Sequence, residues 1–203
     1  MNAGFLNGFM LTLGLIMAIG AQNAHVLRQG LRGEHVLLTV VVSVLCDVSL
    51  ILLGMNGLGA VFSANPDWME AARYGGAAFL GWYGLRSLRS ALAGGSLQAD
   101  AGQRRRLTWR QALLTAAGFS LLNPHAYLDT VVLLGSIGNS QAAELRPLFT
   151  AGAIAGSVCW FVLLGYGARL LAPVFRRPRA WQVLDGGVAL MLWSIAVWLI
   201  LSA

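Results

Sequence analysis

The sequence has few charged residues and lacks lysine altogether. Charged side chains make up 11% of its 203 residues, whereas about a quarter of an ordinary soluble domain is charged. Apolar residues account for 57% of the chain, and its mean hydropathy is +0.68. This composition argues against an ordinary soluble domain and indicates a chain whose solvent is largely the lipid bilayer.

Cysteine is also scarce, and the common enzyme motifs are missing. The two cysteines, Cys46 and Cys159, lie inside apolar runs, where a thiol usually behaves as a small buried hydrophobe. We therefore expect no disulfide. The sequence contains no nucleotide-binding loop, hydrolase triad or Cys-x-x-Cys pair, and we expect neither an enzyme nor a cofactor. No basic residue precedes the first apolar run, which argues against a cleaved signal peptide.

Long apolar runs occupy most of the chain. A bilayer core about 30 Å thick needs about 20 apolar residues per helix, and each run therefore predicts one transmembrane helix. The runs end where Arg, Pro, Gly and acidic residues cluster. Because almost nothing is left over for a second domain, residues 1–203 are expected to form one all-α integral membrane domain. The six predicted spans are 4–26, 36–62, 69–91, 110–136, 147–171 and 181–202.

The fourteen arginines are distributed unevenly over this six-span arrangement. The net charge of +6 could suggest a nucleic-acid partner, but the arginines lie between apolar runs and form no basic face that carries aromatic residues. Twelve fall at the loops that follow spans one, three and five, and only Arg73 and Arg146 fall on the opposite side. The positive-inside rule then makes the side with twelve arginines cytoplasmic and places both termini outside.

The two halves of the sequence, 1–95 and 109–203, resemble each other weakly across a polar linker at 96–108. Each half contains three predicted spans. Because three is odd, the second half must be inserted upside down relative to the first, which is the inverted-repeat plan of many secondary transporters. Three motifs recur in the same order: Asn23-Ala24-His25 with Asn123-Pro124-His125, Leu52-Leu53-Gly54 with Leu163-Leu164-Gly165, and Gly75-Gly76 with Gly186-Gly187.

Two carboxylates lie deep inside predicted spans. Asp47 is near the middle of span two, where an ionised carboxylate costs on the order of 2.5 to 3.5 kcal/mol and needs compensation. Asp129 follows His125 by four residues in span four, which would place both side chains on one helix face as an acid–base pair. Asp185, near the start of span six, is expected instead to reach water or a nearby arginine.

A proline and several polar residues interrupt spans four and one. Asn123-Pro124 lies in mid-span, and proline there removes a backbone hydrogen bond and clashes with the preceding turn, so we expect the helix to kink or break. Inside a bilayer a break is tolerated where it is buried or lines a cavity, and its helix N-terminus would favour a substrate carboxylate. Gln22, Asn23 and His25 form the matching stretch in span one and are expected to face the interior.

Two glycine spacings suggest close helix contacts. Gly4 and Gly8 lie four residues apart in span one, and Gly152 and Gly156 have the same spacing in span five. Small residues at this spacing let two membrane helices approach closely. We expect both pairs to lie at helix contacts.

Four stretches of the sequence carry a resemblance to a known family. They are GAQNAHVLRQGLRGEH (20–35), CDVSLILLGMNGLG (46–59), GGAAFLGWYG (75–84) and LLNPHAYLDTVVLLGSIG (121–138). Together they resemble the lysine and arginine exporter family, the LysE/ArgO group, over essentially the whole chain. The resemblance implies a six-helix carrier of the bacterial inner membrane that exports basic L-amino acids, lysine or arginine, and is driven by the proton motive force.

The hypothesis that follows places the substrate near the bilayer midplane, between the two halves. Asp47 and Asp129 would balance its cationic side chain or take up the exchanged proton, and His125 would act beside Asp129. Amides around Asn23 and Asn123-Pro124 would hold its carboxylate. Rocking of one half against the other would alternate access to the two sides.

Two other functions remain open from the sequence alone. Two histidines and two aspartates could form a mixed site for export of a divalent metal ion. Cys46 and Cys159, which the repeat relates, could instead form a thiol–disulfide electron carrier, although neither lies in a motif that would activate a cysteine. The expected partners are a small-molecule substrate, protons and the lipid bilayer, and a homodimer is left open.

Overall fold

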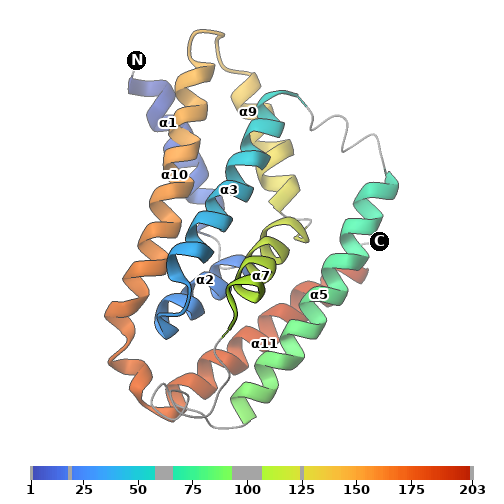
Figure 1. The fold of residues 1–203 in the computed structure, drawn as a ribbon. Helices are drawn as coiled ribbons and strands as arrows, with labels where there is room; N and C mark the ends of the chain where they lie inside the picture. Colours follow the sequence, from blue (N-terminus) through green and yellow to red (C-terminus); the bar gives the residue numbers. More distant parts are fainter. Residues whose placement is uncertain (1, 18–19, 58–65, 93–106, 124–125, 202–203) are drawn as a thin grey trace.

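The computed structural model describes residues 2–17, 20–57, 66–92, 107–123 and 126–201, and every regular element within these ranges is a helix (Figure 1). The all-α prediction is confirmed for this part of the chain. The α-helices are α1 (Asn2–Ile16), α2 (Ala21–Arg32), α3 (Val36–Met55), α5 (Pro66–Leu92), α7 (Trp109–Leu121), α9 (Gly135–Asn139), α10 (Arg146–Gly167) and α11 (Pro178–Leu201). A π-helix, η1 (Tyr127–Leu134), precedes α9, and two short 3₁₀ helices, η2 (Ala168–Leu171) and η3 (Val174–Arg176), follow α10.

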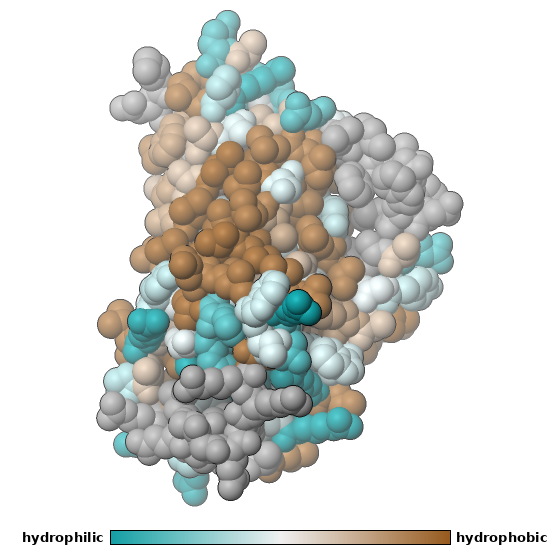
Figure 2. Space-filling view, in the orientation of Figure 1, coloured by the Kyte–Doolittle hydropathy of each residue, from teal (hydrophilic) through white to brown (hydrophobic). Residues whose placement is uncertain are grey.

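Three of the described helices are long and apolar enough to cross a bilayer. They are α3, α10 continued by η2, and α11, and they correspond to predicted spans two, five and six. Helices α1 and α2 meet the same criterion as a pair, although they are bent by 84°. Figure 2 shows an apolar band across α3 and its neighbours, with hydrophilic residues above and below it. The membrane prediction is therefore confirmed at the level of three to four spans.

The remaining predicted spans have a different form. Helix α5 coincides with predicted span three, but its sequence contains Glu70, Arg73, Arg86 and Arg89, which lower its mean hydropathy. Predicted spans one and four are each interrupted, the first between α1 and α2 and the second between α7 and η1. The six-span arrangement and its inverted repeat stay predictions.

Helix α1 packs along α10 through the four glycines singled out in the sequence. A Cβ atom on Gly8 would overlap the backbone carbonyl of Phe149, and one on Gly152 would overlap the carbonyl of Phe5. Gly4 and Gly156 face the same contact, against Leu145 and against Phe9 and Thr12. Because only glycine leaves room for this approach, the prediction of close helix contacts is confirmed.

Helix α5 packs along α11, and Figure 1 shows this pair running beside the group formed by α1, α3 and α10. Leu80 and Tyr83 of α5 meet Val188 and Leu192 of α11 in a buried apolar cluster. The indole of Trp193 donates a hydrogen bond to the carbonyl of Gly81 at 3.2 Å. These contacts tie the two helices into one unit.

Asp185 meets an arginine, one of the two outcomes expected from sequence, but the arginine is distant in sequence, and Asp185 does not reach water. It is 2% exposed and pairs with Arg28 of α2, with 3.2 Å between Nη2 and Oδ1. Arg28 is itself 5% exposed, so it is a buried partner and not a surface charge. The partner lies 157 positions away along the chain, which no local pattern could indicate.

Helices α2, α5 and α10 end, and α7 and α11 begin, at one end of the molecule, at the bottom of Figure 1. We call this the arginine-rich end, because Arg32, Arg89, Arg110, Arg169 and Arg179 belong to it. The positive-inside rule predicts that this end is cytoplasmic and that both termini face outward, and both assignments stay predictions.

Candidate functional site

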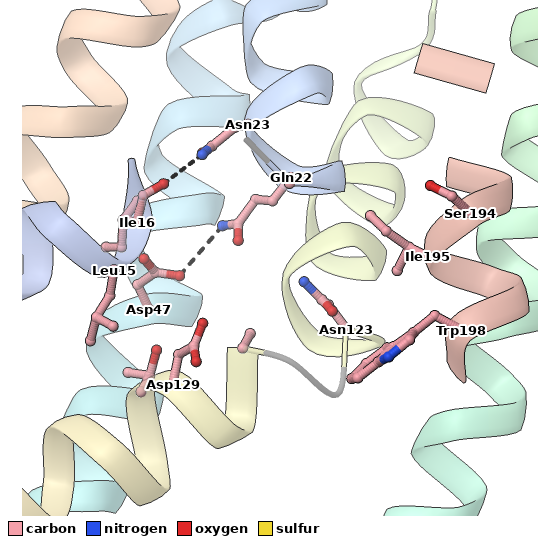
Figure 3. A pocket seen from close by; sticks show the side chains of 13 residues that line it. Leu15, Ile16, Gln22, Asn23, Asp47, Asn123, Asp129, Ser194, Ile195 and Trp198 are labelled. Atoms are coloured by element: carbon pink, nitrogen blue, oxygen red, sulfur yellow. Dashed lines mark hydrogen bonds between the residues drawn. The ribbon is translucent and has the colours of Figure 1, made fainter. Parts of the chain in front are cut away.

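A cavity of about 450 Å³ lies where the two helix breaks meet α3 and α11 (Figure 3). Its volume is within the range of small-molecule sites in proteins, roughly 300 to 1,000 Å³. Its more polar side is formed by α2, α3 and the segment around η1, α1 adds apolar side chains, and α11 adds one hydroxyl beside two large apolar groups. The lining residues are Leu15, Ile16, Gly20, Gln22, Asn23, Asp47, Asn123, Ala126, Asp129, Thr130, Ser194, Ile195 and Trp198.

The first break is held together by Asn23. Its Nδ2 atom donates a hydrogen bond of 2.6 Å to the carbonyl of Ile16, the last residue of α1, and its Oδ1 accepts one of 3.1 Å from the indole of Trp160. Asn23 therefore satisfies a carbonyl that the ended helix leaves open. Gly20, the residue before α2, contributes no side-chain cap, so backbone N–H groups of the first turn of α2 remain beside the cavity.

The second break follows the end of α7. That helix ends at Leu121, and the hydroxyl of Tyr127 donates a hydrogen bond of 2.8 Å back to the carbonyl of Leu121. The break predicted in span four is thus confirmed. Pro124 and His125 lie outside the described residues, and so does the proposed pairing of His125 with Asp129.

The chain continues after this break as the π-helix η1, which is eight residues long. π-helical turns are rare and occur frequently at functional sites. Asp129 lies in the first turn of η1, where the helix dipole favours a negative charge, and Asp129 and Thr130 both line the cavity. The break therefore supplies the second carboxylate of the site.

Asp47 brings the first carboxylate to the cavity from α3. It is 6% exposed, and its two oxygens accept hydrogen bonds from Gln22 of α2 at 3.4 Å and from Ser157 of α10 at 3.1 Å. Both donors are uncharged, and among the described residues no ion pair involves Asp47. A buried carboxylate that is hydrogen-bonded without a cation leaves its charge available to a cationic ligand.

His25 does not line this cavity, although the sequence grouped it with Gln22 and Asn23. It is 2% exposed, its ring stacks on Phe119 with 4.9 Å between centroids, and its Nδ1 lies 3.4 Å from the hydroxyl of Tyr83. His25 is thus part of an aromatic cluster between α2, α5 and α7. Neighbouring residues of a helix point in different directions, which separates His25 from the cavity side of α2.

Sequence reasoning missed the contribution of α11. Ser194, Ile195 and Trp198 form the wall that faces the two carboxylates in Figure 3. Ser194 and Trp198 are four residues apart and share a helix face. This spacing of a hydroxyl and an indole, inside an otherwise apolar span, is the signal that could have found them.

The two alternatives considered from the sequence gain no support from the described part of the chain. Over those residues, no three side chains of His, Cys, Asp or Glu lie close enough to hold a metal ion. Cys46 and Cys159 are both free thiols.

Comparison with known proteins gives the class of the chain. The family model described as LysE type translocator matches residues 13–203. YggA of Aeromonas salmonicida, named provisionally as an amino-acid transporter, is 43% identical over 198 residues, which cover 97% of this chain and 95% of that protein. The arginine exporter proteins ArgO of Yersinia enterocolitica and Photorhabdus laumondii are 38% and 36% identical over 196 residues, 97% of this chain and 95% and 94% of theirs. No solved structure matches.

Apolar helices that suit a bilayer, and a cavity with two acidic side chains between broken spans, are typical of a membrane transporter for a small molecule. The match over nearly the whole chain makes the assignment specific: the chain belongs to the LysE family of translocators and is an amino-acid exporter of that family. The family resemblance seen in the sequence is thereby confirmed.

Proposed function

We propose that this chain exports basic L-amino acids, arginine and lysine, from the cytoplasm across the bacterial inner membrane in exchange for protons. The observation that carries the proposal is the charge of the cavity. Among its described lining residues, Asp47 and Asp129 are acidic and none is basic. A cavity with one sign of charge and low-dielectric walls favours a ligand of the opposite sign.

The charge count of the substrate fits the two carboxylates. A basic amino acid has two cationic groups, the α-ammonium and the side chain, whereas a neutral amino acid has only the first. Asp47 and Asp129 offer one counter-charge to each cation. A neutral amino acid would leave one of the two carboxylates without a cationic counter-charge, and this unmet charge would discriminate against it.

The two breaks supply a place for the substrate carboxylate. The residue before α2, Gly20, and its first-turn residue Gln22 line the cavity, and so does Ala126 at the second break. The N-terminus of a helix carries the positive end of the helix dipole, which favours a carboxylate. An amino acid would thus meet acidic side chains and the N-terminus of α2 in the same cavity.

Two matching glycine contacts support an inverted repeat. Gly30 of α2 lies against the backbone of Gly165 in α10, and Gly135 of α9 lies against the backbone of Gly54 in α3. In each case the second part of a broken span packs on the second helix of the other half. Such crossed pairing suits two halves that rock against each other to alternate access.

Proton exchange is assigned to the same carboxylates. When the substrate leaves, an ionised Asp47 would remain buried with only uncharged donors, at a cost of several kcal/mol. A proton taken up from outside removes that cost. Competition between proton and substrate for one carboxylate couples the two movements.

The test uses inside-out membrane vesicles, in which export appears as uptake. With an imposed proton gradient, labelled arginine and lysine should accumulate and leucine should not. Asp47→Asn and Asp129→Asn should each lower arginine uptake at least about tenfold, because the cation loses its counter-charge in a buried site. Glu144→Gln is the matched control, since Glu144 is an exposed carboxylate outside the cavity and its loss should leave uptake unchanged.

Three results would contradict the proposal. If both aspartate variants took up arginine at the unmodified rate, the two carboxylates would not be part of the substrate site. If leucine were taken up as fast as arginine, the site would have no preference for cationic substrates. If uptake did not depend on the proton gradient, transport would not be coupled to protons.

A further inference from the structure

A buried charged network joins α2, α5 and α11 outside the cavity. Both carboxylate oxygens of Asp185 lie 3.2 Å from Nη2 of Arg28. Nη1 of Arg28 donates to the hydroxyl of Ser87 at 3.3 Å, and that hydroxyl donates to the backbone carbonyl of Asp185 at 3.0 Å. All three residues are buried: Arg28 is 5% exposed, Asp185 is 2% exposed and Ser87 is 0% exposed.

The network lies on the arginine-rich side of the cavity. Along α2, Arg28 is six residues beyond the cavity residue Gln22, about 9 Å at 1.5 Å per residue. Along α11, Asp185 is nine residues before the cavity residue Ser194, about 14 Å. Both displacements run toward the arginine-rich end, so two helices that line the cavity meet again at this network beneath it.

A packed aromatic layer lies between the cavity and the network along α2 and α11, because His25 falls between Gln22 and Arg28 and Leu192 between Asp185 and Ser194. The ring of Phe119 from α7 contacts Tyr83 of α5 and His25 of α2, with centroid distances of 4.6 and 4.9 Å. Leu192 of α11 is fully buried in the same cluster. Among the described residues, rings packed this closely leave no room for a substrate within the layer.

The network is suited to a contact that forms and breaks. The Nε atom of Arg28 and the Oε1 atom of neighbouring Gln29 are buried without a hydrogen-bond partner among the described residues. A buried ion pair contributes little net stability when its hydrogen bonds are incomplete, because desolvation offsets the attraction. Opening toward the arginine-rich end would return both charges to water at little cost.

We propose that Arg28, Asp185 and Ser87 form the inner closure of the transport path, which seals the cavity at the arginine-rich end in this state and separates when the path opens there. The inference rests on the proposed function, because a closure has meaning only in a transporter. Arg28 and Asp185 are positioning residues in this role. They hold α2 against the α5–α11 pair and do not touch the substrate.

The test measures closure without any substrate. In a Cys46→Ser, Cys159→Ser background, Val188→Cys places a thiol on α11, three residues from Asp185 toward the cavity and 8% exposed in the parent chain. A membrane-impermeant maleimide is then added to the arginine-rich side in inside-out vesicles. The thiol should react slowly while the pair is intact, and Asp185→Asn or Arg28→Gln should raise the labelling rate at least about fivefold by shifting the population toward the open state.

Two further variants separate closure from simple loss of structure. Ser87→Ala removes one hydroxyl and no charge, and it should raise labelling about twofold to threefold with normal protein levels. Arg28→Lys keeps the charge and should label more slowly than Arg28→Gln. Arg146→Gln is the matched control, because Arg146 is an exposed arginine bonded to the carbonyls of Asn139 and Gln141 and should leave labelling unchanged.

Unchanged labelling in Asp185→Asn, Arg28→Gln and Ser87→Ala would overturn the closure, and so would equal labelling of Arg28→Lys and Arg28→Gln. Labelling needs neither arginine nor a proton gradient. The proposed closure can therefore be disproved even if the Asp47 and Asp129 variants abolish export. It can equally be supported if those variants export normally.

Discussion

At the scale of single residues, the cavity has two chemically different walls. Asp47 and Asp129 face it from α3 and η1, whereas α11 presents Ser194, Ile195 and Trp198. Trp198 is 52% exposed, and Figure 3 shows its indole at the edge of the cavity. An indole face attracts a guanidinium or ammonium group, so under the proposed function Trp198 is the partner of the substrate side chain across from the carboxylates.

We predict that Trp198→Leu raises the KM for arginine uptake about fivefold, with a range of about twofold to 30-fold, because a cation–π contact contributes roughly 0.5 to 2 kcal/mol. Trp198→Phe keeps an aromatic face and should have a smaller effect. Trp193→Phe is the control, since Trp193 bonds to Gly81 and is not part of the cavity wall. Initial uptake rates over a range of arginine concentrations measure the effect, and an unchanged KM in Trp198→Leu would exclude the contact.

At the scale of helices, close glycine contacts determine which helices pair. Gly8 of α1 and Gly152 of α10 each meet a backbone carbonyl of the opposite helix. Gly54 and Gly135 form a similar approach between α3 and α9. Because lipid is as apolar as the side chains, membrane helices gain little from hydrophobic burial and depend on van der Waals packing at such contacts.

Gly8→Ala should destabilise the protein by about 1 to 3 kcal/mol, because the added Cβ forces the backbones of α1 and α10 apart. Gly14→Ala on the same helix has open space around its Cβ and should be neutral or slightly stabilising. Thermal unfolding of the purified protein in detergent compares the two variants. Equal stability of Gly8→Ala and Gly14→Ala would show that the α1–α10 contact is looser than described.

At the scale of the whole molecule, the arginines are concentrated where α2, α5 and α10 end. The cavity lies away from that end, with the Arg28–Asp185 network and the aromatic layer between them. If this end is cytoplasmic, the structure represents a state closed to the cytoplasm. The orientation therefore decides which step of the export cycle the structure shows.

The positive-inside rule predicts that both termini face the periplasm. A short epitope tag added at either end should be accessible to an impermeant label in intact spheroplasts and protected in inside-out vesicles. A tag inserted near Gln98, in the polar linker, should show the opposite pattern. Protection of either terminal tag in spheroplasts would reverse the assignment of that terminus.

Much of the secondary structure could be predicted from local pattern. The ends of α5, α10 and α11 agree with predicted spans to within a few residues, because apolar runs and their charged flanks are local features. The break near Asn123 followed from Pro124, since proline interrupts a helix whatever surrounds it. The bend between α1 and α2 has no proline, and only its polar residues indicated it.

The sequence alone was enough to predict that the chain lies in a lipid bilayer, that its fold is all-α and which family it belongs to. It also singled out Asp47 and Asp129 as acidic candidates for the site, because composition, hydropathy and short motifs carry that information. Only the tertiary structure decided which groups meet. It joined Asp47 to Ser157 across 110 positions and Arg28 to Asp185 across 157, and it placed His25 among aromatic rings and not in the cavity. Such contacts depend on how helices distant in sequence pack together, which local sequence patterns do not specify.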